Sequence, residues 1–299
     1  VQQYDLNTDC LLFDNTNFFT YIDTKTDSKL AKRGNSKEKR KDLKIIGLSM
    51  MVSPDFNVPL FYEVYPGNRN DSKQFSNVLG KLKKRYQDLC GKEHTVTLVF
   101  DKGNNSPENI QKVIEDCNDI HCKFVSSLKF NQCKELLEIP KKQYVSLSDK
   151  RLKGCSAYRV EKEVYGQNMT VVIVNNPELI EGQLQGISKN IEQCQSELLG
   201  LQLSLENRAN GVITKGKSPT IDSTTKRVQK ILSKDYMKDV FSYEVYELNA
   251  NIRLKYQFDS DALACICEKY LGKTILFTNN HNWTTDRIIL AYRSQYHIE

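Results

Sequence analysis

The alternation of apolar segments in the first 130 residues is the feature that most constrains the fold. Two segments carry helix-start signals: Asn70-Asp71-Ser72 precedes one helix and Ser106-Pro107 begins another. Runs rich in β-branched and aromatic residues, typical of buried strands, occupy 10–20, 43–52, 58–65, 95–100 and 122–128. The order β-β-β-α-β-α-β predicts an α/β domain with a mixed sheet flanked by helices.

After about residue 145 the pattern changes. Strand-like runs at 158–164 and 169–174 predict a hairpin. Apolar residues then recur at helical spacing over 187–205. This stripe fits either a coiled-coil dimer seam or packing against a following helix at 223–234.

The last sixty residues return to mixed signals. Strand-like alternation covers 241–258, and Ser260 is the predicted cap of the helix that follows. A short strand is expected at 274–278. The final helix is predicted to begin at Thr284 and to run to Glu299.

Two aspartates each follow an apolar run: Asp14 after Leu11-Leu12-Phe13, and Asp101 after Leu98-Val99-Phe100. A carboxylate where a strand leaves the core is poorly placed for packing and well placed for chemistry at the sheet edge. If their strands pair centrally, the two like charges repel unless a cation lies between them. With Glu299 they provide the oxygen ligands that two Mg²⁺ ions about 4 Å apart need to hold a phosphodiester. Taken singly, each acid would more commonly form a salt bridge or cap a helix.

The net charge of +6 is concentrated in one segment. Residues 25–44 contain nine lysines and arginines against three acidic residues, so the rest of the chain is neutral overall. A basic run of this kind is commonly a solvated loop. This one begins shortly after Asp14, which favours a loop that faces phosphate groups.

The nine cysteines are scattered and include no CxxC pair. Cys117, His121 and Cys122 are close in sequence, as are Cys265 and Cys267, but the spacing is poor for zinc and favours half-buried free thiols. A chain of 299 residues needs no disulfides to fold, so its cysteines are expected to be reduced, as in a cytosolic protein. No run approaches eighteen apolar residues, and therefore no membrane span is expected.

Several segments resemble DDE-type insertion-sequence transposases. Residues 14–19 (DNTNFF) are similar to the first catalytic-aspartate motif of that family, and residues 100–106 (FDKGNNS) to the second. The basic segment 31–44 resembles the one these enzymes carry before their second strand. Pro66-Gly67-Asn68 with Asp71 is similar to their third-strand exit. The resemblance covers almost the whole chain, in order.

At the end of the chain, Tyr292 and Glu299 match the tyrosine and the glutamate of the family signature that contains the last acid. That signature has an arginine three residues after the tyrosine. Here this position is Gln295, and Arg293 lies two residues earlier. The chain therefore differs from the signature at the arginine that clamps phosphate in the family, whereas the glutamate, Glu299, is retained.

The resemblance implies a ribonuclease-H-like catalytic domain with a β-rich insertion before the final glutamate. Almost two hundred residues separate Asp101 from Glu299, so an insertion is needed on spacing alone. The expected division is 1–144 for the first part of the catalytic domain, 145–258 for an insertion of strands and a helical hairpin, and 259–299 for the last part.

The resemblance also implies a DNA transposase that cleaves and joins DNA strands of an insertion sequence. Asp14, Asp101 and Glu299 would be its catalytic residues and the ligands of two Mg²⁺ ions, with Mn²⁺ as a substitute. Its partners would be the double-stranded DNA of element ends and target, bound by a homodimer at the nucleoid of a prokaryotic cell. The residues expected to contact DNA are Lys32, Arg33, Lys39, Arg40, Tyr292 and Arg293.

Two other functions stay open. A nuclease of the same fold would use the same acids for hydrolysis without strand transfer. An inactive DNA-binding remnant would keep the basic segment and lose an acid, whereas all three acids are present. Trp283, the only tryptophan, is either buried against the core or available to stack on an extruded base.

Overall fold

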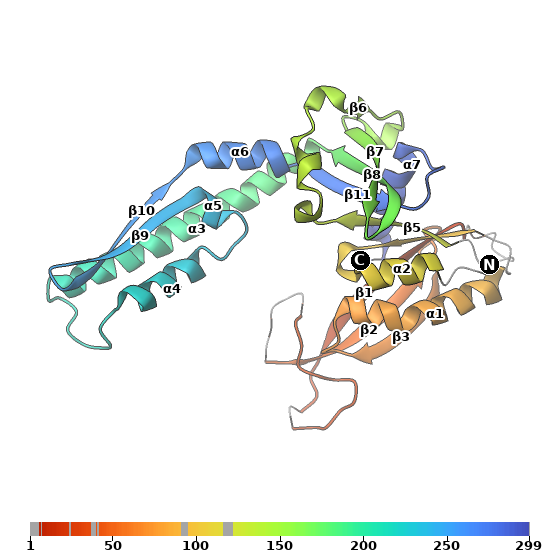
Figure 1. Cartoon of the computed structure of the whole chain (residues 1–299). Coiled ribbons are helices and arrows are strands. Elements are labelled where there is room, and N and C mark those ends of the chain that lie inside the picture. The colour runs from red at the N-terminus through yellow and green to blue at the C-terminus, as the bar shows by residue number, and fades with distance from the viewer. Residues whose placement is uncertain are drawn as a thin grey trace. The chain divides into compact units, whose positions relative to one another are not determined.

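The computed structural model describes the chain except for residues 1–5, 7, 24, 37–39, 41, 91–94, 116–121 and 299. It divides into two compact units, a larger one of residues 1–175 with 274–299 and a smaller one of residues 176–273. Both units are drawn in Figure 1. Among the described residues, no helix is both long enough and apolar enough to cross a membrane.

A nine-stranded mixed sheet forms the centre of the larger unit, in the order β3-β2-β1-β4-β5-β11-β8-β7-β6. Its strands are β1 (Cys10–Thr20), β2 (Lys44–Val52), β3 (Pro59–Pro66), β4 (Val96–Phe100), β5 (Cys122–Leu128), β6 (Val145–Ser146), β7 (Ser156–Val164), β8 (Gln167–Asn175) and β11 (Lys273–Thr278). β1 pairs antiparallel with β2, and β2 antiparallel with β3, while β4 runs parallel to both β1 and β5. The mixed sheet expected for a ribonuclease-H-like α/β domain is confirmed.

Helices cover both faces of this sheet. Successive side chains of a strand point to opposite faces, so Leu12 and Phe13 serve different layers. Phe13 packs against Phe75 at a ring-centroid distance of 5.1 Å, whereas Leu12 shares a core cluster with Ile288. The helices of the larger unit are α1 (Asp71–Cys90), α2 (Pro107–Glu115) and α7 (Thr285–Arg293), with short 3₁₀ turns that include η2 (Lys102–Asn104), η6 (Lys150–Leu152) and η7 (Ser294–His297).

The strands at 145–175 join the large sheet. β7 pairs antiparallel with β6 and with β8, and all three lie in the larger unit. The units therefore divide at 175/176 and 273/274, whereas the predicted insertion spans 145–258. The prediction and the smaller unit overlap over 176–258.

The smaller unit has its own core. Its elements are α3 (Glu178–Ala209), α4 (Ile221–Ile231), α5 (Met237–Val240), β9 (Phe241–Leu248), β10 (Asn251–Phe258) and α6 (Ser260–Tyr270). The apolar stripe of α3 is buried in one cluster with Val228, Leu232 and Leu254. The stripe thus packs against β10 as well as against the following helix α4, and it is not exposed as a dimer seam.

Two predicted helix ends differ from the structure. The cap of α6 is Asp259 rather than Ser260, because the Asp259 carboxylate accepts hydrogen bonds from the backbone N–H groups of Asp261 and Ala262. The final helix does not stay α-helical to the chain end: α7 stops at Arg293 and continues as η7. Tightening into a 3₁₀ turn is common at helix ends. Glu299 lies outside the described residues.

Candidate active site

Asp14 and Asp101 occupy neighbouring positions on two central strands. β1 and β4 are parallel, with Phe13 opposite Phe100, and each aspartate is the next residue along its chain. Asp14 lies in the middle of β1, which continues to Thr20, whereas Asp101 directly follows β4. The central pairing that the sequence required of these strands is observed.

Both carboxylates point toward the face on which α7 packs. Leu12 and Val99 belong to the core cluster of that face, and each aspartate lies two residues further along its chain. Asp101 keeps an extended conformation, with φ −75° and ψ 160°, so the alternation of sides persists through it.

Tyr292 of α7 reaches the same place. Its hydroxyl donates a hydrogen bond to Oδ1 of Asp101, at 3.2 Å, and is hydrogen-bonded to Oγ of Ser127, at 2.8 Å. Ser127 lies on β5, next to β4 in the sheet. The tyrosine thus ties the final helix to the strand end that carries Asp101.

The third predicted acid, Glu299, cannot be placed, since it lies outside the described residues. Within the part of the chain that is described, no three His, Cys, Asp or Glu side chains are grouped to hold a metal ion. η7, which leads toward Glu299, contacts β1, the strand of Asp14. The oxygen donors of Asp14 and Asp101 fit a hard divalent cation in their chemistry.

A further carboxylate lies beside Asp101. A Cβ built on Gly103 would be 3.8 Å from Oδ2 of Asp71 and 3.9 Å from Oδ2 of Asp101. Asp71 begins α1, directly after the exit from β3. The region around the carboxylates therefore combines β1, the end of β4, the start of α1 and α7.

Comparison with known proteins assigns the chain to a family. The model of a family described as the transposase DDE domain matches residues 19–299. The chain belongs to this family. Asp101 and Tyr292 fall inside the match, and Asp14 lies five residues before it begins.

Two solved transposases are similar to this DDE domain. A piggyBac transposase in a synaptic complex with hairpin DNA is 14% identical, with a TM-score of 0.32, over 55% of this chain and 30% of that one. A Mos1 transposase in a paired-end complex with the left transposon end is 14% identical, with a TM-score of 0.27, over 40% of this chain and 36% of that one. The match spans about a third of the length of each. No curated protein sequence matches the chain.

A buried network of polar side chains surrounds Asn15, the residue after Asp14 in the DDE domain. The sequence did not predict this network. Asn15, 4% exposed, donates to Oδ1 of Asn104 at 2.8 Å and accepts from Oγ of Ser49 at 2.7 Å. Gln74 donates to Ser49 at 3.1 Å and accepts from Arg69 at 2.7 Å. The network connects β1, β2 and α1 to the turn η2 that follows Asp101. The only signal for it in the sequence is polar residues inside apolar strands.

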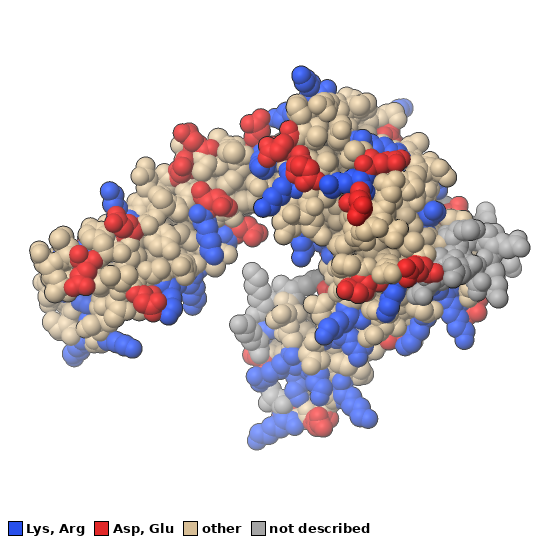
Figure 2. Space-filling model, viewed as in Figure 1, with Lys and Arg blue, Asp and Glu red and all other residues tan. Residues whose placement is uncertain are grey.

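The basic segment of the DDE domain extends the β1–β2 pair. Lys32 forms an isolated antiparallel bridge with Ile45, and its Nζ lies 3.7 Å from Asp27. Arg33 is exposed. Arg40 pairs with Asp42 and lies 5.7 Å from the ring centroid of Phe19. Figure 2 shows lysines and arginines on the end of the larger unit that this segment forms.

Lys39 and Arg293 were also predicted to contact DNA. Lys39 lies outside the described residues. Arg293 turns toward the segment before β7, where its Nη2 is 3.1 Å from Sγ of Cys155 and its Nη1 is 3.5 Å from the carbonyl oxygen of Arg151. Its role in DNA binding stays a prediction.

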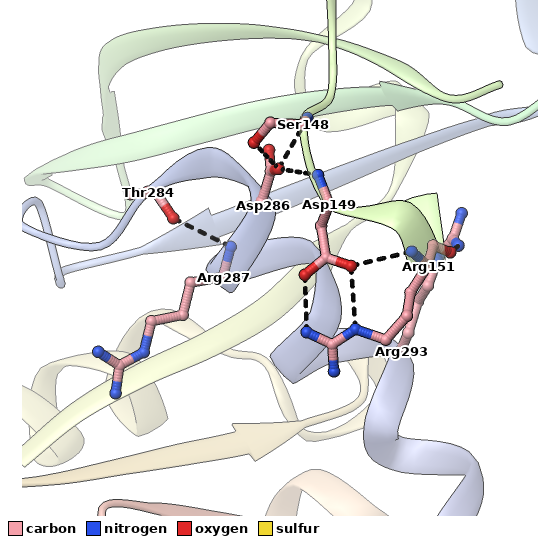
Figure 3. Close-up of polar contacts among 7 residues, drawn as sticks. All are labelled: Ser148, Asp149, Arg151, Thr284, Asp286, Arg287 and Arg293. Carbon is pink, nitrogen blue, oxygen red and sulfur yellow. Dashed lines mark hydrogen bonds and ion pairs between the residues drawn. The ribbon is translucent and has the colours of Figure 1, made fainter. Parts of the chain in front are cut away.

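The start of α7 is held by the segment before β7 (Figure 3). Oδ2 of Asp286 accepts three hydrogen bonds, from the N–H and Oγ of Ser148 and from the N–H of Asp149, at 2.7–2.9 Å. Burial raises the pKa of Asp286, but these bonds outweigh burial and leave it below its usual value. Hydrogen bonds from Arg151 lower the pKa of Asp149 to about 2.

Trp283 is buried, at 8% exposure, and the guanidinium of Arg287 lies 4.2 Å from its ring centroid. Burial against the core, one of the two interpretations of this residue, is therefore confirmed. The described cysteines are free thiols, among them Cys122, Cys265 and Cys267. Cys117 and His121 fall outside the described residues.

Proposed function

We propose that this chain is the catalytic part of a DNA transposase that cleaves and joins the DNA strands of an insertion sequence. The observation that carries the proposal is the parallel pairing of β1 with β4, which makes Asp14 and Asp101 neighbours at the centre of the sheet. Membership of the DDE family supplies the reaction class.

In this proposal Asp14, Asp101 and Glu299 hold two Mg²⁺ ions, for which Mn²⁺ can substitute. The bound ions would neutralise the charge on the attacked phosphate and lower the pKa of the attacking hydroxyl group. Tyr292 keeps the carboxylate of Asp101 in place through its hydrogen bond. Asn104, fixed by Asn15, orders the turn that follows Asp101.

The proposal that the partner is DNA rests on the positive charge of the basic segment and on its position in the sheet. The basic segment joins β1, the strand that carries Asp14, to β2, and its Lys32 bridges to Ile45 of β2, so phosphates that it binds would lie at that end of the β1–β2 pair. We assign Lys32, Arg33, Lys39 and Arg40 to contacts with the backbone of element ends and target. We further propose a homodimer on DNA, an insertion between Asp101 and Glu299, and a cytoplasmic location in a prokaryote.

The test compares the wild-type chain with Asp101→Asn, using element-end DNA and Mg²⁺. Loss of one carboxylate removes several kcal/mol of transition-state stabilisation, so cleavage should fall by at least about a hundredfold. DNA affinity should change little, because the proposed phosphate contacts lie elsewhere. Asp88→Asn, an exposed aspartate of α1, is the matched control and should cleave as the wild type does.

Three results decide between functions. Cleavage and joining by the wild type, both lost in Asp101→Asn, support the transposase. Cleavage without joining favours the nuclease. Equal cleavage by Asp101→Asn and the wild type excludes the assigned mechanism.

A further inference from the structure

A polar cavity of about 400 Å³ lies in the larger unit where three of the family-like motifs meet. β1 contributes Asn15 and Asn17, and the basic segment contributes Asn35 and Ser36. The exit from β3 contributes residues 67–71. Ligand cavities commonly measure about 300–1,000 Å³, so this one has room for a single small group.

Glycines bring the three segments together. A Cβ on Gly34 would collide with the carbonyl oxygen of Gly67, and a Cβ on Gly67 would collide with the carbonyl of Ile45. A Cβ on Gly47 would collide with the ring of Tyr65. Backbone contact this close requires glycine. The cavity is therefore fixed by the packing of backbone segments, not by movable side chains.

The polar side chains of the cavity form two groups. Asn15, Arg69 and Asn70 are held by hydrogen bonds to Asn104, Gln74 and the N–H of Ser72, respectively. The side chains of Asn17, Asn35 and Asn68 make no hydrogen bond to another residue of the described chain. Three amides, each able to donate and to accept, thus line the cavity and remain available to a ligand.

The chemistry of the lining selects the ligand. A phosphate is disfavoured, because the one arginine is already bonded to Gln74 and Asp71 adds a negative charge at the rim. Neutral amides instead match a group that offers a donor beside an acceptor. The major-groove edge of adenine is such a group, because asparagine pairs in two-point fashion with its N6 and N7, whereas guanine offers only acceptors there.

One end of the cavity, at Asp71, lies near Asp101, while its β1 residues, Asn15 and Asn17, lie on the opposite face of the sheet from the Asp14 carboxylate. Asp71 lines it, and the Asp71 and Asp101 carboxylates approach the same position next to Gly103. Burial raises the pKa of Tyr65, and the charges of Asp71 and Asp14 raise it further. We infer that the cavity binds the edge of one adenine base of the bound DNA; this inference rests on the proposed function.

The experiment selects duplexes from a randomised library with the wild-type chain and with the double variant Asn35→Ala, Asn68→Ala. The wild type should enrich adenine at one position, and the double variant should lose that preference by about tenfold or more, the discrimination that one two-point amide–base contact supplies. The salt dependence of DNA affinity should be unchanged, since no phosphate contact is removed. Asn131→Ala, an exposed amide outside the cavity, should select as the wild type does.

A second probe replaces the enriched adenine by 7-deazaadenine, which lacks the N7 acceptor. The wild type should bind this duplex about tenfold more weakly, whereas the double variant should not distinguish the two duplexes. Identical selection by wild type and double variant overturns the inference while leaving the transposase proposal intact. A wild type that binds no DNA overturns both.

Discussion

At the scale of single residues, the polar network around Asn15 is the main addition to what the sequence offered. Removing a buried amide that bonds to both neighbouring elements costs more free energy of unfolding than its hydrogen bonds contribute, because the buried partners are left unsatisfied. Here the partners are Ser49 on β2 and Asn104 in η2. The network therefore serves the position of the Asp101 turn as well as the stability of the sheet.

Asn15→Ala should lower the free energy of unfolding of the larger unit by about 2–3 kcal/mol, the cost of leaving buried polar groups unpaired. Urea unfolding followed by Trp283 fluorescence measures it. Asn17→Ala is the matched control, two residues along the same face of β1 and without a side-chain hydrogen bond to the described chain. It should stay within about 0.5 kcal/mol of the wild type. Equal losses in both variants would contradict the role of the network.

Tyr292→Phe removes only the hydroxyl that donates to Asp101. A hydrogen bond to a charged group contributes about 1.5–3 kcal/mol, and a part of this should be lost from the transition state. Cleavage should therefore fall about tenfold, while DNA affinity stays constant. Tyr296→Phe, 69% exposed, should leave cleavage unchanged. Full cleavage by Tyr292→Phe would show that its hydroxyl is not needed to place Asp101.

At the scale of elements, helix ends decide where functional residues lie. α6 begins one residue earlier than the predicted cap Ser260 implies, since both Asp259 and Ser260 are residue types that cap helices. The distinction depends on backbone conformation: Asp259 is extended, with φ −110° and ψ 105°, and its side chain reaches two free N–H groups.

Asp259→Ala should therefore destabilise the smaller unit by about 1 kcal/mol, the usual cost of a lost cap. Ser260→Ala should cost less than about 0.5 kcal/mol, because Ser260 is already helical. Thermal unfolding followed by circular dichroism at 222 nm compares the two. A larger loss for Ser260→Ala would return the cap to the residue predicted from the sequence.

Asp286 ties the start of α7 to the segment before β7, and its lowered pKa makes this tie dependent on pH. A carboxylate with a lower pKa in the folded state stabilises the fold above its unfolded pKa, near 4. That contribution is lost as the pH falls through the folded value. Asp286→Asn should thus be less stable than the wild type at pH 7, and the difference should shrink as the pH falls below about 4. Thermal unfolding over this range measures it, with Asp88→Asn as a control whose difference stays near zero. A constant difference would show that the charge is irrelevant.

At the scale of the whole molecule, each of the two units has buried apolar residues of its own. In the larger unit they lie on both faces of the nine-stranded sheet, and in the smaller unit they form the cluster around α3. The only tryptophan, Trp283, lies in the larger unit, whereas the 32-residue helix α3 lies in the smaller one. Fluorescence and circular dichroism at 222 nm therefore weight the two units differently.

Leu198→Ala should destabilise the smaller unit by about 2–5 kcal/mol, because Leu198 is fully buried in its core. The transition followed by circular dichroism should shift, and the fluorescence transition of Trp283 should stay in place. Leu199→Ala, on the same helix and 48% exposed, should shift neither. Equal shifts of both signals by Leu198→Ala would mean that the two units unfold as one.

The sequence by itself determined the local elements and the two aspartates. Periodicity, caps and turn residues depend on near neighbours in the chain, so the strand at 122–128 and the helix beginning at Pro107 were found at the observed positions. Asp14 and Asp101 were found because each interrupts an apolar run, a signal that needs no knowledge of pairing.

Only the tertiary structure decided which strands are neighbours and which polar residues meet. A hairpin of strands 158–164 and 169–174 was predicted, and β7 and β8 form it over 156–175. Its membership in the large sheet depends on partners about a hundred residues away, which an apolar pattern does not specify. For the same reason the sequence did not reveal the contacts of Asn15 with Ser49 and Asn104, or the cavity formed with Asn35 and Asn68. In the sequence, a polar strand residue that is hydrated cannot be distinguished from one that bonds to a distant side chain. The packing of the segments in three dimensions, including the glycine contacts, determines which partner the residue has.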